Sequence, residues 1–63
     1  MRSIDELPFV VEEWVGGQCH EILSMNYNSI LARAAYEAAI NVRPRSQIIM
    51  RQKARVLARH NPD

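Results

Sequence analysis

Hydrophobic residues follow two different spacings along this chain, and the change from one to the other predicts its elements. Residues 8–25, PFVVEEWVGGQCHEILSM, are two runs rich in Val, Ile and aromatic residues on either side of Gly16-Gly17. Such runs around a glycine pair are typical of a β-hairpin. Pro8 cannot donate a hydrogen bond to a neighbouring strand, so we expect it at the start or the edge of the hairpin.

The register of this hairpin has two alternatives. A two-residue turn would place Glu12 opposite Glu21 and would leave apolar residues on both faces. A three-residue loop with a bulge would gather apolar residues on one face, and we favour this arrangement. That face would comprise Phe9, Val11, Val15, Cys19, Leu23 and Met25.

Residues 26–44, NYNSILARAAYEAAINVRP, predict a helix. They are rich in alanine, contain no internal glycine or proline, and begin with a polar residue that can cap a helix, Asn28 or Ser29. The helix must end by Pro44. Apolar residues recur at intervals of three and four, which predicts that one face of mostly small side chains packs in the core. These residues are Leu31, Ala34, Ala35, Ala38 and Val42.

Residues 47–59, QIIMRQKARVLAR, combine apolar and basic side chains. The apolar residues scatter around a helical wheel, but at a spacing of two they separate from the basic ones. The pattern therefore predicts a strand, although several of these residues favour helices by intrinsic propensity. Gln52 interrupts the apolar side, so a bend near Arg51–Lys53 into a second hairpin is the alternative. The apolar side of the strand would comprise Ile48, Met50, Ala54, Val56 and Ala58. The basic side would comprise Arg51, Lys53, Arg55 and Arg59.

This order of elements predicts a single α+β domain spanning residues 1–63, in which one helix packs on one face of a small antiparallel-containing sheet. The order is ββαβ or, if the last segment bends, ββαββ. We expect residues 1–7 and 60–63 to be flexible ends. A chain of 63 residues buries only about 60% of the surface that its unfolded form exposes, so the core is small.

Domains of this size usually gain stability from disulfides, a metal or a second copy. Cys19 is the only cysteine, which excludes an internal disulfide and favours a reducing, cytoplasmic setting. No stretch approaches the roughly 18 apolar residues of a membrane span, and the acidic residues near the start do not fit a secretory signal. We therefore expect no membrane partner. We expect a homodimer, because a three-stranded sheet with open edges and one uncovered face can pair with a second subunit.

The charge is distributed unevenly, although the net charge is only +1. Residues 1–42 carry a net charge of −4 and residues 43–63 carry +5. This asymmetry indicates either an anionic partner for the basic segment or contacts within the sheet. In the second case, the basic side of the last strand would meet Glu12, or Glu13 and Glu21.

Side chains with catalytic or metal-binding chemistry are few. Cys19 and His20 are neighbours, but adjacent residues of a strand point to opposite faces and cannot readily share one target. His60 is expected in the flexible end, and the only two glycines serve a turn, which leaves no phosphate-binding loop. We expect no enzymatic activity, no cofactor, no metal and no small-molecule substrate.

The candidate binding residues are the basic side chains of the last strand and one aromatic residue. A row of cations on one side of a strand would be spaced about 7 Å apart, near the phosphate repeat of a nucleic acid. The pI of about 8.0 is modest, because nucleic-acid-binding domains often exceed about 9. We expect a homodimeric protein-interaction module with an unidentified protein partner, and nucleic-acid binding as the alternative. The candidates are Arg51, Lys53, Arg55, Arg59 and Trp14.

The run ARAAYEAAI, followed by RP and IIMRQKARVLAR, resembles small uncharacterised proteins of α-proteobacteria and their phages. In these a hairpin, an alanine-rich helix and a closing I-x-x-R-x-x-A-R-V strand or hairpin recur. The resemblance implies the same order of elements and an accessory or phage-encoded origin, for which binding and inhibiting a host component is one role. No activity and no functional residue come with it. Related chains favour Asp-Gly or Gln-Gly in the last element, where this chain has Gln52-Lys53, which puts a tight turn there in doubt.

Overall fold

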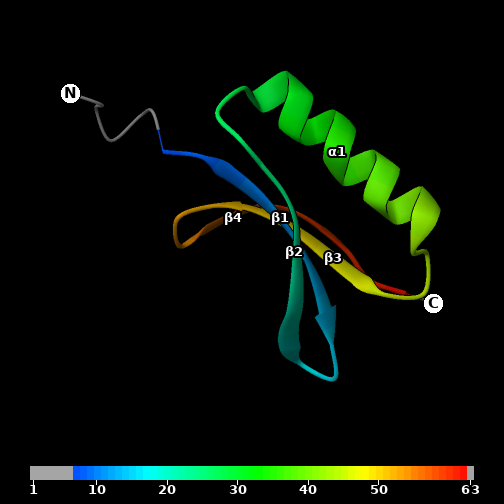
Figure 1. The fold of residues 1–63 in the computed structure, drawn as a ribbon. Helices are drawn as coiled ribbons and strands as arrows, with labels where there is room; N and C mark the ends of the chain where they lie inside the picture. Colours follow the sequence, from blue (N-terminus) through cyan, green and yellow to red (C-terminus); the bar gives the residue numbers. More distant parts are fainter. Residues whose placement is uncertain (1–6, 63) are drawn as a thin grey trace.

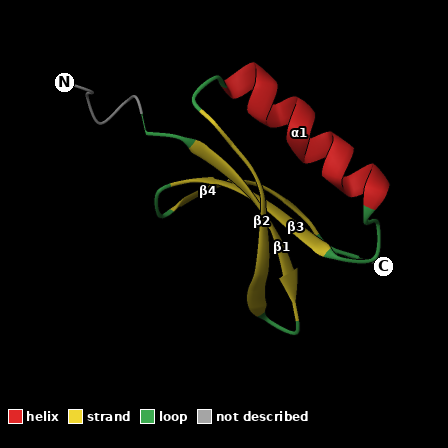
Figure 2. Ribbon diagram, viewed as in Figure 1, coloured by secondary structure: helices red, strands yellow, loops and turns green. Residues whose placement is uncertain are grey.

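The computed structural model describes residues 7–62, which form two β-hairpins joined by one helix (Figures 1 and 2). This confirms the α+β class and the ββαββ order. The expected flexibility of residues 1–6 and 63 lies outside the described residues. The elements are β1 (Phe9–Val15), β2 (Gln18–Asn26), α1 (Ser29–Val42), β3 (Gln47–Gln52) and β4 (Arg55–His60).

The four strands form one sheet in the order β2-β1-β3-β4, and all neighbours are antiparallel. The two central strands come from different hairpins, so the pairing of β1 with β3 joins the two halves of the chain. The expected single closing strand is wrong because the chain turns at Lys53-Ala54 and returns as β4. Lys53 adopts a φ of 56° in this turn, a left-handed conformation that is uncommon for residues other than glycine.

The first hairpin closes with two residues and not three. Val15 pairs with Gln18, and the intervening Gly16 and Gly17 have φ angles of 62° and 81°. Two consecutive positive φ angles fit the type I′ turn, which twists the strands in the direction that a hairpin requires. Glycine adopts this backbone without steric cost.

The bulges of this hairpin lie within β2. The pairing with β1 shifts twice, so that His20 and Leu23 have no direct partner on β1. The bulge at Leu23 allows this side chain to pack against the core under α1. The expected apolar face is therefore wrong: Leu23 lies on the helix side, whereas the cross-strand pairing places Cys19 and Met25 on the opposite face.

Asn28 begins the helix as expected. Its Oδ1 accepts hydrogen bonds from the backbone N–H groups of Ile30 (2.8 Å) and Leu31 (3.1 Å), which satisfies two of the donors that a helix start leaves unpaired. At the other end, the Arg43 N–H donates to the Ala39 carbonyl at 2.8 Å. The helix ends at Val42, before Pro44.

The core lies between α1 and the two central strands. The helix buries Ala32, Tyr36 and Ala39, and the two alanines allow it to approach the sheet closely. Burial raises the pKa of the Tyr36 hydroxyl. The strands contribute Val11, Ile48 and Met50 to the same cluster.

The expected core face of α1 is largely wrong. Leu31 is 56% exposed and Val42 is 75% exposed, and Ala34 and Ala38 are also exposed. The reason is that the apolar residues of α1 cover an arc much wider than one stripe. Periodicity defines this arc, but it cannot say which half of the arc packs on the sheet.

Residues 60–62 lie near the start of β3. His60 is the last residue of β4, and its Nε2 lies 3.2 Å from the Pro44 carbonyl oxygen.

The only helix in residues 7–62 is too short to cross a lipid bilayer.

Candidate functional site

The second hairpin separates the basic residues that were expected in one row. Because Met50 faces α1 and side chains alternate along a strand, Arg51 lies on the opposite face of the sheet. Arg59 lies on that face too, since it pairs with Ile49. Arg55 pairs with Gln52 on the helix side, and Lys53 lies in the turn. The evenly spaced row of cations is therefore wrong.

Arg51 is held by an acidic residue of the neighbouring strand. Its Nε donates to Glu12 Oε1 at 2.9 Å and its Nη2 donates to Glu12 Oε2 at 2.8 Å. The Trp14 indole N–H donates to Glu12 Oε1 at 3.1 Å. Glu12 is only 3% exposed, and the hydrogen bond from Arg51 lowers the pKa of its carboxyl despite burial. The expected contact between the basic segment and Glu12 is confirmed for Arg51.

The sheet face away from α1, called the far face, carries this ion pair at its centre and apolar side chains around it. Val10 and Ile49 are buried there between longer cross-strand neighbours. Ile22, Met25 and Val56 are about half-exposed. The far face is therefore largely apolar, with one neutralised charge pair and one exposed cation, Arg59, and the helix of the described chain leaves it uncovered (Figure 1).

Cys19 lies on the far face as the cross-strand partner of Trp14. It is a free, exposed cysteine. Desolvation and the Glu12 carboxylate raise the pKa of its thiol. Because the thiolate is the nucleophilic form, this surrounding makes Cys19 a poor nucleophile at neutral pH.

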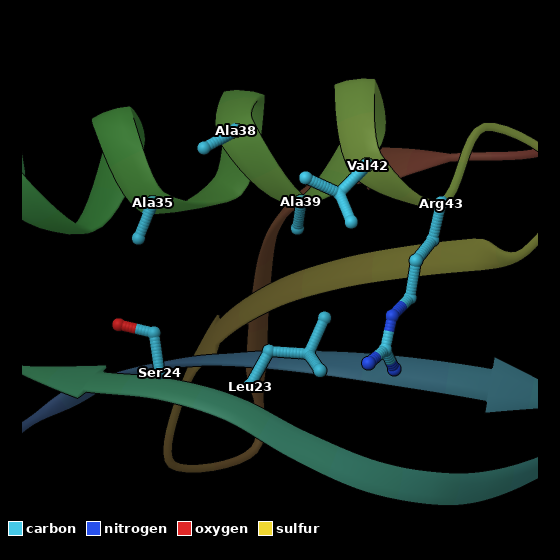
Figure 3. Close-up of a pocket in the computed structure, with 7 residues that line it drawn as sticks. All are labelled: Leu23, Ser24, Ala35, Ala38, Ala39, Val42 and Arg43. Atoms are coloured by element: carbon cyan, nitrogen blue, oxygen red, sulfur yellow. The ribbon is translucent and has the colours of Figure 1, made fainter.

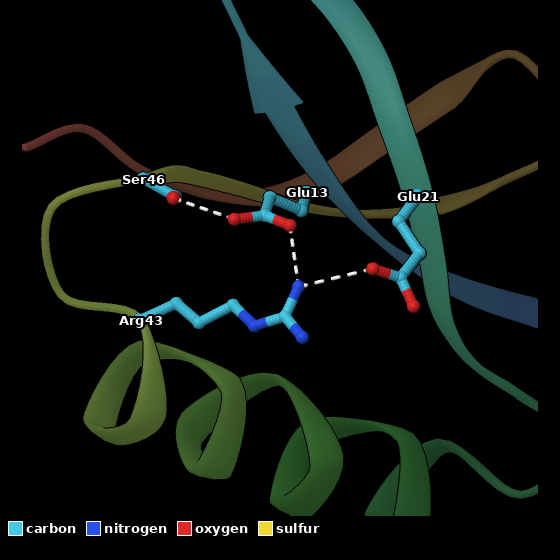
Figure 4. Close-up of polar contacts among 4 residues, drawn as sticks. All are labelled: Glu13, Glu21, Arg43 and Ser46. Atoms are coloured by element: carbon cyan, nitrogen blue, oxygen red, sulfur yellow. Dashed lines mark hydrogen bonds and ion pairs between the residues drawn. The ribbon is translucent and has the colours of Figure 1, made fainter.

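A second group of charges lies on the helix side of the sheet (Figure 4). Glu13 and Glu21 are opposite each other on β1 and β2, where two like charges would repel. Arg43 Nη1 lies between them and donates to Glu13 Oε1 and, at 3.1 Å, to Glu21 Oε1. Ser46 Oγ donates to Glu13 Oε2 at 2.6 Å. The hydrogen bond from Ser46 and the Arg43 charge lower the pKa of the Glu13 carboxyl.

This network ties the end of α1 to both strands of the first hairpin. The expectation that the last strand would meet Glu13 and Glu21 is wrong. The cation that pairs with both is Arg43, the residue directly after α1, which lies outside the predicted strand. The sequence offers one signal for it: Arg43 immediately precedes Pro44, where the helix must end and the chain must turn back to the sheet.

His20 completes a group that resembles the donor set of a divalent cation. The ligand atoms of Glu13, His20 and Glu21 lie within 4.8 Å of one another, because the β2 bulge disturbs the alternation that would otherwise separate His20 from Glu21. The Arg43 guanidinium already pairs with both carboxylates. A metal ion would have to displace that cation, so we propose no metal site here.

The exposed half of the apolar arc on α1 forms a continuous surface. This surface, called the α1 flank, consists of Leu31, Ala34, Ala38 and Val42. A groove of about 360 Å³ runs beside it, between α1 and the edge strand β2. Figure 3 shows Leu23 rising from β2 toward the helix while Ala35, Ala39 and Val42 point into the gap. The residues that line the groove are Leu23, Ser24, Ala35, Ala38, Ala39, Val42 and Arg43.

Comparisons with protein-family models, with curated proteins and with solved structures gave no match for this chain. The resemblance to small α-proteobacterial and phage proteins stays a prediction. The function is therefore inferred from the surfaces of the fold itself.

Proposed function

We propose that the protein is a non-enzymatic protein-interaction module that acts as a homodimer, with the α1 flank as the interface between the two copies. The observation that supports this most is the exposure of Leu31 and Val42 on a helix whose other half already forms the core. Complete burial of an exposed Leu or Val side chain contributes about 1.5 to 3 kcal/mol. A monomer would leave both side chains in water.

The α1 flank fits a second copy of itself. It is large at its two ends, Leu31 and Val42, and small between them, at Ala34 and Ala38. A two-fold axis across the middle of α1 would pair the helices antiparallel, with Leu31 against Val42 of the partner subunit. The alanines would then let the helix axes approach each other. Since the flank contains no charged residue, the symmetry would bring no like charges together within it.

The groove beside α1 extends this surface. Leu23 and Ala35 line it next to Val42, so it offers an apolar place for Leu31 of the partner subunit. β2 is an edge strand on the same side, and the interface would cover part of this edge. A fold with so small a core would gain stability from this association.

The test of the homodimer is the mass in solution of three proteins, measured by gel filtration with light scattering. We expect the wild-type chain at twice 7.3 kDa. Leu31→Lys should run as a monomer, because a charge would be buried in the apolar interface. Glu37→Lys is the matched control: it places the same residue on an exposed position of α1 outside the flank, and it should remain a dimer.

Two results would contradict the proposal. A wild-type monomer at high protein concentration would eliminate the homodimer. A dimer that survives Leu31→Lys would move the interface elsewhere, for example to the edge of β2. The circular dichroism spectrum of each variant controls for loss of the fold.

The far face is the proposed site for another protein. Ile22, Met25 and Val56 supply apolar contacts there, and helix pairing across the α1 flank would leave them accessible. The module would act as an accessory or inhibitory protein, by occupying a surface of its partner. Met25→Lys should abolish co-purification of a protein partner from the native cell while the homodimer persists, and Glu37→Lys should not. Equal recovery with both variants would contradict this assignment.

Nucleic-acid binding is the second candidate, and one observation favours it. Arg51 and Arg43 form ion pairs with the three acidic residues Glu12, Glu13 and Glu21. The remaining cations of the second half of the chain have no ion pair within residues 7–62: Arg45, Lys53, Arg55 and Arg59.

The test of this candidate is a titration of a short labelled DNA or RNA at two salt concentrations. Binding should weaken as salt rises, since phosphate contacts release counterions. Simultaneous replacement of Lys53 and Arg55 by Ala should weaken it further without unfolding the protein. Absence of binding at low salt would remove the candidate.

A further inference from the structure

A second hollow, of about 360 Å³, lies where the first turn meets the start of β3 and the segment after β4. Its volume is within the range of small-molecule sites, about 300 to 1,000 Å³. Unlike the groove beside α1, it combines an aromatic ring, side-chain amides, an arginine and glycine backbone. The residues that matter are Trp14, Gly16–Gly17, Arg45, Gln47 and Asn61.

Two side-chain amides face each other in this hollow. Gln47 Nε2 donates to Asn61 Oδ1 at 2.8 Å. Each amide has an NH2 group with two donors and a carbonyl oxygen that accepts, so this hydrogen bond leaves the Asn61 NH2 group and the Gln47 carbonyl oxygen free. Neither group has another partner within residues 7–62. A donor beside an acceptor is the pattern that base edges match with two hydrogen bonds.

Trp14 stands next to this amide pair as the cross-strand partner of Gln47. Side chains in such a pair lie on the same face of the sheet. The hydrogen bond from the Trp14 indole N–H to Glu12 fixes the ring, and Glu12 is itself held by Arg51. The ring is therefore oriented before any ligand arrives, as a stacking surface requires.

Positive charge accompanies the ring and the amides. Arg45 lines the hollow and makes no ion pair within residues 7–62. Arg59 precedes Asn61 by two residues, which is about 7 Å along an extended backbone. The acidic residue that accepts the Trp14 hydrogen bond, Glu12, is neutralised by Arg51. A ligand that brings an aromatic ring, a polar edge and a phosphate would find a partner for each.

We propose that this hollow binds one unpaired base of a single-stranded nucleic acid. The base stacks on Trp14, its polar edge meets the free groups of Gln47 and Asn61, and its phosphates meet Arg45 and Arg59. Stacking on an aromatic side chain beside a basic groove is the usual way in which single strands are bound. This inference goes beyond the interaction module and needs no homodimer. It also differs from the nucleic-acid candidate above, which depends on Lys53 and Arg55.

Trp14 is the only tryptophan of the chain, so its fluorescence reports on the site directly. We expect a short oligothymidylate to quench this fluorescence in a saturable way, and added salt to weaken the binding. Arg45→Ala and Gln47→Leu should each weaken binding by about tenfold. Arg33→Ala is the control, because it removes an exposed cation of α1 that does not line the hollow, and its affinity should stay within about twofold of the wild type. Circular dichroism checks that both site variants fold. If Gln47→Leu does not fold, Arg45→Ala still tests the proposal, because Arg45 is at an exposed position.

Three outcomes would overturn the proposal. One is the absence of quenching at low salt. Another is equal weakening by Arg33→Ala and Arg45→Ala, which would indicate attraction to charge alone. The third is equal affinity for thymidine monophosphate and the oligothymidylate, which would make a free nucleotide the ligand. The homodimer is judged separately, because the light-scattering mass does not depend on these variants.

Discussion

Glu12 and Glu13 are neighbours on β1 whose carboxylates lie on opposite faces of the sheet, and each is held by a different arginine. Glu12 is paired with Arg51 of β3 on the far face, and Glu13 with Arg43 at the end of α1. Both side chains are almost fully buried. A buried carboxylate is tolerated only when it is paired and hydrogen-bonded, so both pairs contribute to the fold.

These two carboxylates predict how stability depends on pH. The pKa of each is lowered below 4.5 in the folded protein, so the unfolded chain binds protons more readily than the folded one. Their contribution is therefore present above pH 4.5 and is lost as pH falls through the lowered values. Urea unfolding between pH 7 and pH 2 should show a falling midpoint below about pH 4.5. A midpoint that stays constant over this range would contradict the role assigned to the two pairs.

Arg51 was expected at a binding surface, and the structure gives it a structural partner. Arg51→Ala would leave Glu12 buried without its cation, and we expect the free energy of unfolding to fall by about 2 kcal/mol. Arg55→Ala, at an exposed residue with no ion pair within residues 7–62, should change it by less than about 0.5 kcal/mol. Chemical unfolding of both variants distinguishes them. Equal effects would show that Arg51 does not hold the sheet.

Among the elements, the helix and the first hairpin could be predicted from the sequence. Asn28 and Pro44 mark the limits of an alanine-rich segment, and Gly16-Gly17 provides two residues that accept positive φ. The second hairpin could only be offered as an alternative, because Lys53-Ala54 lacks the Asn or Gly that usually indicates such a turn. The register of β2 was missed, since nothing in the types of His20 and Leu23 indicates a bulge.

The candidate surfaces were predicted less well than the elements. Alternation placed Arg51 and Lys53 on one side of a single strand, whereas the turn that was offered only as an alternative places Lys53 outside β3. Arg43 lies outside the predicted strand, so no pattern connected it to Glu13 and Glu21. For α1, the spacing of apolar residues is correct, but their arc is wide enough to serve both the core and an interface.

The turn between β3 and β4 carries its own prediction. Lys53 has a positive φ of 56°, a conformation in which Cβ approaches the following carbonyl oxygen. Lys53→Gly should therefore raise the free energy of unfolding by about 0.5 to 1 kcal/mol. Lys53→Ala keeps the Cβ and should leave stability almost unchanged. If thermal unfolding shows that Lys53→Gly destabilises the protein, Lys53 does not adopt the left-handed conformation in solution.

On the scale of the whole molecule, one helix covers one face of a four-stranded sheet and leaves two apolar surfaces in contact with solvent. The far face carries Ile22, Met25 and Val56, and the α1 flank carries Leu31 and Val42. The core beneath α1 is small, and most of the helical part of it is alanine. Association of two copies across the α1 flank would therefore stabilise the fold.

This coupling predicts that thermal stability depends on protein concentration. Binding of a second copy to the folded state raises the melting temperature by mass action. The melting temperature of the wild type should rise over a hundredfold increase in concentration, while that of Leu31→Lys should not. A wild-type melting temperature that does not depend on concentration would show that association of two copies does not stabilise the fold.

The most direct test of the central claim places a thiol at the proposed two-fold axis. In a Cys19→Ser background, Ala38→Cys lies on the α1 flank and Arg33→Cys lies on the polar side of the same helix, both at exposed positions. If the homodimer forms through the α1 flank, a short bifunctional maleimide should link Ala38→Cys into a covalent species of twice 7.3 kDa and leave Arg33→Cys largely monomeric. Equal cross-linking of the two variants, or none of Ala38→Cys, would contradict a homodimer formed through the α1 flank.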